Sequence, residues 1–108
     1  MRNLTDDDVE TAFDWLRENA SAAAKAKAER VYLEAFSKSL KSLLMQEHHN
    51  LAVSAQERDA YADVRYVKHL EALKEAVFQD EKIRFLREAA LAKIDAWRSW
   101  SANERVRV

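Results

Sequence analysis

The sequence predicts an all-α protein, and three observations support this fold class. The 108-residue chain contains no Gly, no Pro and no Cys, whereas an average protein has about 7% Gly and about 5% Pro. The tight turns that join β-strands depend on Gly, Asn or Asp. The commonest residues are good helix formers, namely Ala, Leu, Glu, Lys and Arg. We therefore expect an elongated helical hairpin or bundle that forms one domain over residues 1–108.

The first predicted helix covers about residues 6–18. Thr5 suits the N-cap position, and the three aspartates of residues 6–8 occupy the first turn, where negative charge favours the helix dipole. Val9, Ala12 and Leu16 then recur at helical spacing.

A second helix is predicted over about residues 21–48. Its apolar positions, Leu33, Phe36, Leu40 and Leu43, have the 3-4-3 spacing of a coiled coil. This stripe is out of phase with the first one, which favours a break or a kink near Asn19. A single helix that changes its buried face remains the alternative.

A short helix is predicted over about residues 55–61. Ser54 and Glu57 have the spacing of a capping box, in which Ser54 is the N-cap and Glu57 lies at N3. Asp63 follows as a suitable cap for the next helix.

The last predicted helix covers about residues 64–102 and would span roughly 58 Å. A compact domain of 100 residues has a radius of gyration of only about 13 Å. The helix has two apolar faces out of phase, one of which carries Tyr66, Leu70, Leu73 and Val77. We expect the other face to form a homodimer or larger oligomer interface; its residues are Ile83, Leu86, Ala90, Ile94 and Trp97. The polar residues 103–108 are expected to fray.

Charge and hydropathy restrict the location and the partners. The net charge is −1, so no global attraction to nucleic acid or to an anionic membrane is expected. Apolar residues make up 48% of the chain, which is enough for a core. No signal peptide and no membrane span are recognisable. We expect a cytoplasmic protein that does not bind membranes.

No catalytic or cofactor site is predicted. The chain cannot form a Gly-rich phosphate loop or use a cysteine thiolate, because it has neither residue type. His48 and His49 are adjacent and therefore point in different directions on a helix, unlike the i, i+4 histidines of zincins. The consecutive acids of residues 6–8 also diverge, so no metal site and no enzymatic activity are expected.

The segment of residues 96–107 is the best candidate for binding a partner. It interleaves two tryptophans with arginines, an arrangement suited to stacking nucleic-acid bases and contacting phosphates. The candidate residues are Trp97, Arg98, Trp100, Arg105 and Arg107, with Lys25, Lys27 and Arg30 as a second basic group. Tryptophans at helical spacing equally fit packing within the fold, and the second group also fits a solvated face of mixed charge.

Three stretches of the chain carry a resemblance to a class of known proteins. They are residues 29–34 (ERVYLE), residues 55–62 (AQERDAYA), and residues 80–90 (DEKIRFLREAA) continuing into residues 96–99 (AWRS). Together they resemble small helical proteins of tailed phages and prophages, which are often encoded among early replication and recombination genes. The resemblance covers most of the chain from about residue 25. It implies a phage accessory protein in the host cytoplasm that handles DNA or a DNA-handling partner.

Three functions are therefore expected as alternatives. The first is an accessory role in DNA recombination or replication, through binding of single-stranded DNA or a DNA-handling protein. The second is a protein-interaction module, such as an adaptor or inhibitor of a host protein, without affinity for nucleic acid. The third is a minor structural component of a virion.

Overall fold

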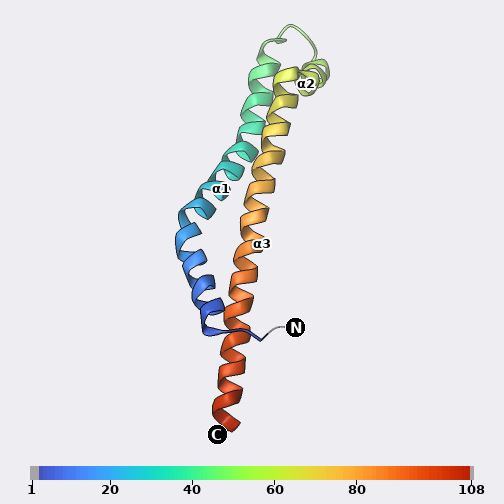
Figure 1. Ribbon diagram of the computed structural model, residues 1–108. Coiled ribbons are helices and arrows are strands. Elements are labelled where there is room, and N and C mark those ends of the chain that lie inside the picture. Colours follow the sequence, from blue (N-terminus) through green and yellow to red (C-terminus); the bar gives the residue numbers. More distant parts are fainter. Residues whose placement is uncertain (1–2, 108) are drawn as a thin grey trace. The chain divides into compact units, whose positions relative to one another are not determined.

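The protein is all-α, as the sequence predicts. A computed structural model describes residues 3–107 and the side chains of residues 3–105. The described chain contains three helices and no strand: α1 (Asp6–Gln46), α2 (Val53–Ala62) and α3 (Val64–Arg107) (Figure 1). Helices α1 and α3 are the two long ones, with 41 and 44 residues.

Helix α1 is continuous, so the predicted break near Asn19 is wrong and the alternative of a single helix is the correct one. The Asn19 side-chain amide donates a hydrogen bond to the Trp15 carbonyl oxygen at 2.9 Å, within the helix. The Thr5 cap is confirmed: the Asp8 N–H donates to Thr5 Oγ1 (3.1 Å), and the Thr5 N–H donates to Asp8 Oδ2 (3.0 Å). The helix ends at Gln46, and residues 47–50 form a turn.

Helix α2 begins at Val53 with Ala52 as its N-cap, and no side chain caps it. The predicted Ser54–Glu57 capping box is therefore wrong, because Ser54 already lies in the first turn. The cap at Asp63 is confirmed, since its Oδ1 accepts a hydrogen bond from the Arg65 N–H at 2.8 Å.

Helix α3 continues to Arg107, five residues beyond the predicted end at 102. The expected fraying of residues 103–107 is thus replaced by helix, and Val108 lies outside the described residues.

The contacts divide the chain into two compact units. The terminal unit comprises Met1–Ala24 and Glu81–Val108, and the hairpin unit comprises Lys25–Asp80. In the terminal unit the first half of α1 packs against the second half of α3. Its core consists of Val9, Ala12, Ala90 and Ile94, with Trp15, Leu16 and Trp97 packed around them.

In the hairpin unit, α1 and α3 lie antiparallel and α2 connects them (Figure 1). The buried residues are small or polar as well as apolar: Leu44, Ala60, Ala76 and His69. A row of rings crosses the helix contacts, in which Phe36 meets His69 (centroids 5.6 Å apart) and Tyr66 meets Tyr61 (5.2 Å). This unit is therefore held by aromatic and polar contacts as much as by aliphatic packing.

Within residues 3–107, none of the helices combines the length and the apolarity that crossing a lipid bilayer requires.

Candidate functional site

The C-terminal tryptophans have different environments. The Trp97 indole Nε1–H donates a hydrogen bond to Asp6 Oδ1 at 3.0 Å, and the ring packs on the core of the terminal unit. Trp100 is 51% exposed. Trp97 is therefore engaged in its own fold, and Trp100 is the ring of this pair that faces solvent.

The arginines near these rings are exposed. Arg98 lies 4.0 Å from Asp95, and the Arg105 Nε–H donates to the Ser101 carbonyl oxygen at 3.5 Å. The side chain of Arg107 lies outside the described side chains. The predicted binding segment thus presents Trp100, Arg98 and Arg105 at the surface.

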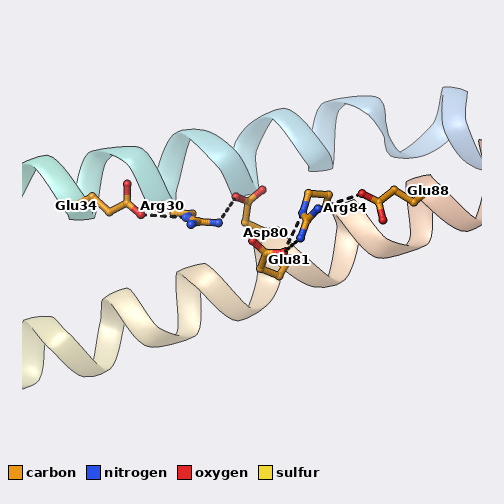
Figure 2. A network of polar contacts seen from close by, with 6 residues as sticks. All are labelled: Arg30, Glu34, Asp80, Glu81, Arg84 and Glu88. Atoms are coloured by element: carbon orange, nitrogen blue, oxygen red, sulfur yellow. Dashed lines mark hydrogen bonds and ion pairs between the residues drawn. The ribbon is translucent and has the colours of Figure 1, made fainter.

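The second basic group lies in the hairpin unit. Lys25 and Lys27 are exposed. Arg30 contacts Glu34 (3.0 Å) and Asp80 (3.2 Å), and it links α1 to α3 (Figure 2). In the terminal unit, Arg84 bonds Glu81 (2.9 Å) and Glu88 (3.0 Å) along α3. Arg30 therefore neutralises a carboxylate of its own chain.

The stripe predicted as an oligomer interface is partly covered within the chain. Ala90 and Ile94 are 7% and 4% exposed, because the first half of α1 packs on them. Leu86 is 45% exposed and Ile83 is half-buried. Residues of α1, and not a second copy of the chain, pack against Ala90, Ile94 and Trp97.

A serine and a histidine meet inside the hairpin unit. Ser37 Oγ lies 2.6 Å from His69 Nε2 and 3.2 Å from the Leu33 carbonyl oxygen. Which atom of the pair carries the shared proton depends on the tautomer of His69. In either case the contact links α1 to α3 inside the hairpin unit.

Charged side chains also join the three helices of the hairpin unit. Arg65 bonds Glu47 (2.5 Å) and Asp63 (2.9 Å), and these contacts lower the pKa of Asp63 to about 2 and also lower the pKa of Glu47. Lys41 bonds Glu57 at 2.8 Å and lies over the Tyr61 ring, and these contacts raise the pKa of Lys41. Among the described residues, no three His, Asp or Glu side chains gather as metal ligands would.

A groove of about 840 Å³ runs between α1 and α3 in the hairpin unit. Its lining is Lys25, Ala26, Ala28, Glu29, Tyr32 and Leu33 from α1, and Ala72, Glu75, Ala76 and Gln79 from α3. Tyr32 is 61% exposed and stacks on Phe36, with the ring centroids 5.9 Å apart. The groove is thus lined by apolar side chains together with a few charged and polar ones.

Sequence reasoning missed this groove. Alanines lie on every face between residues 20 and 28 and give no periodic signal. Tyr32 is the one residue whose position could have indicated the groove, because this large ring lies outside the predicted stripe of Leu33, Phe36, Leu40 and Leu43. Comparison of the chain with protein-family models, curated proteins and solved structures finds no match.

Proposed function

We propose that this chain is a non-enzymatic accessory protein that acts by binding another protein through exposed apolar helix faces. One observation carries the proposal. Among the described residues, fifteen large apolar side chains are at least 39% exposed, while no large side chain is fully buried. Contiguous exposed apolar surface marks interaction sites on soluble proteins.

The exposed apolar residues occur in both units. The hairpin unit carries many of them, including Val31, Tyr32, Leu43, Val53, Val64 and Phe78. A helical module with such faces suits a partner that supplies an amphipathic helix. The resemblance to early phage proteins makes a DNA-handling protein in the host cytoplasm a fitting partner.

Direct binding of single-stranded DNA is the second candidate. It is favoured by one observation, the exposed Trp100 ring close in sequence to the exposed Arg98. Against it, Trp97 and Arg30 are engaged within the chain, and the net charge is −1. A role as a minor virion component has no observation that favours it.

Anisotropy of a fluorescent single-stranded oligonucleotide at low salt separates the two candidates. We expect no binding by the wild-type chain. Salt-dependent binding that is lost in the double variant Trp100→Ala, Arg98→Ala would overturn the protein-binding proposal in favour of DNA. Lys38→Ala on α1, which removes one positive charge as the double variant does, controls for a general charge effect.

A further inference from the structure

The groove of the hairpin unit offers a face on which a partner can pack. Its α1 side runs from Lys25 to Leu33 and its α3 side from Ala72 to Gln79, so each side covers about two helical turns, or roughly 12 Å. Four of the ten lining residues are alanines, and such small side chains allow the backbone of another helix to approach closely. The groove therefore presents a face on which helices from outside the unit can pack.

The α3 edge of the groove has opposite charges at its two ends. Ala72, Glu75 and Gln79 line the groove, and Lys68 precedes Ala72 by one turn. Positions i, i+4 and i+7 lie on one face of a helix, so Lys68 and Glu75 flank Ala72 on the same edge. Lys68 is exposed. An edge with a cation at one end and a carboxylate at the other is complementary to an antiparallel copy of itself.

We propose that a second copy of the chain covers this groove, packed antiparallel about a two-fold axis between Lys68 and Glu75, so that α3 lies over α3 of the partner subunit. Lys68 then lies opposite Glu75 of the partner subunit, and the same pair forms again on the other side of the axis. Such an isologous contact uses the same surface on both subunits. The inference rests on the proposed function, because it names the protein partner of one of the exposed apolar faces.

Side-chain sizes match in the same arrangement. Ser37 and His69 are in contact, so these positions of α1 and α3 are at the same level of the hairpin. An axis midway between Lys68 and Glu75 therefore crosses α1 near Leu33 and Phe36. Leu43, which is 55% exposed, then falls opposite the groove alanines Ala26 and Ala28 of the partner subunit. A large side chain is thus placed over small ones, as tight helix packing requires.

The alternative two-fold axis, parallel to the helices, is disfavoured by charge. It would bring α3 over the partner's α1 at the same level, so that Glu75 would lie beside Glu29 of the partner subunit. Both carboxylates line the groove, and like charges in contact oppose association. The antiparallel arrangement instead places Glu75 opposite a lysine on each side of the axis.

Reversal of one charge at a time tests the inference. Sedimentation equilibrium at low ionic strength measures the dimer dissociation constant of the full chain and of Lys68→Glu, Glu75→Lys and the double variant. Each single reversal places like charges opposite each other twice, so we expect a dissociation constant about ten-fold higher. The double variant restores both pairs and should return to within about three-fold of wild type.

The matched control is Lys38→Glu, which reverses a lysine on the side of α1 away from the groove and should leave the dissociation constant unchanged. Circular dichroism of each variant checks that the helices form. A monomer at every concentration overturns the inference, and so does a dimer that is insensitive to the single reversals or not restored by the double variant. In these cases the proposed function still stands, because binding of another protein does not require a dimer. The proposed function is tested separately by the anisotropy measurement with the single-stranded oligonucleotide.

Discussion

Thr5 and Asp8 exchange two hydrogen bonds at the start of α1, and this reciprocal cap satisfies backbone groups that a helix end leaves open. Thr5→Ala removes the side-chain acceptor and is expected to lower the free energy of unfolding by about 0.5–2 kcal/mol. Urea denaturation followed by circular dichroism measures the change. Thr11→Ala, at an exposed position inside α1, is the control and should be neutral or slightly stabilising. Equal losses in both variants would contradict the role of the cap.

His69 is the buried polar residue of the hairpin unit, at 7% exposure, and Ser37 is its hydrogen-bond partner. Ser37→Ala leaves Nε2 of His69 without this hydrogen-bond partner, so we expect a loss of about 1–3 kcal/mol in the free energy of unfolding. Ser39→Ala, at an exposed position two residues on, should change it by less than about 0.5 kcal/mol. If the two variants unfold at the same urea concentration, the contact contributes no net stability.

Residues that act on their own neighbours in sequence were partly predictable. Thr5 and Asp63 cap helices as expected, because a cap depends on spacing of two or three residues. The box expected at Ser54 fails for a local reason that the pattern did not contain. The Gln56 side-chain amide donates to the Leu51 carbonyl oxygen at 2.8 Å, and the Gln56 N–H donates to the Ala52 carbonyl oxygen, so the helix starts two residues earlier.

At the scale of elements, the unbroken helix α1 replaces two predicted helices. The shift of the apolar stripe predicts a break, but the alanines between the two stripes have the highest helix propensity and fit on any face of a helix. The continuity of α1 also explains why the packing of α1 on the second half of α3 was not predicted. The helix of 41 residues packs on Ala90 and Ile94. The sequence predicts no such contact for a separate helix of residues 6–18.

The contact of α1 with α3 in the terminal unit depends on Ile94, which is 4% exposed in the core with Val9 and Ala12. Ile94→Ala is expected to cost about 2–5 kcal/mol of unfolding free energy, since it removes buried methyl groups and leaves a cavity. Leu91→Ala, less than one turn away and 45% exposed, should cost less than about 1 kcal/mol. Thermal unfolding of the two variants compares them directly. A similar loss at both positions would mean that Ile94 is not covered by α1.

The junction of α2 and α3 should respond to acid. Arg65 lowers the pKa of Asp63 from the ordinary 3.8 to about 2. A carboxyl whose pKa is lower in the folded chain contributes stability above its unfolded pKa, and that contribution is lost as pH falls from about 4 to about 2. Asp63→Asn keeps a good N-cap residue and should lack this part of the pH dependence. The free energy of unfolding measured across pH 2–6 tests it, and parallel curves for the variant and the wild type would contradict the assignment.

At the scale of the whole molecule, the all-α class followed from composition, whereas the candidate site did not. The groove is formed by two segments far apart in sequence, Lys25–Leu33 and Ala72–Gln79. No local sequence pattern predicts that these segments come together. The same limit applies to Trp97 and Arg30. Their spacing suited nucleic acid, but their partners Asp6 and Asp80 lie 91 and 50 residues away.

The exposed apolar faces are proposed to bind protein, with a second copy of the chain as one partner. This proposal is tested by the mass of the chain in solution, measured over a range of concentrations with and without a single-stranded oligonucleotide at low salt. We expect a mass that rises with concentration from 12.5 kDa towards twice that value and does not change with the oligonucleotide. A mass of 12.5 kDa at every concentration, increasing only when the oligonucleotide is added, would contradict it.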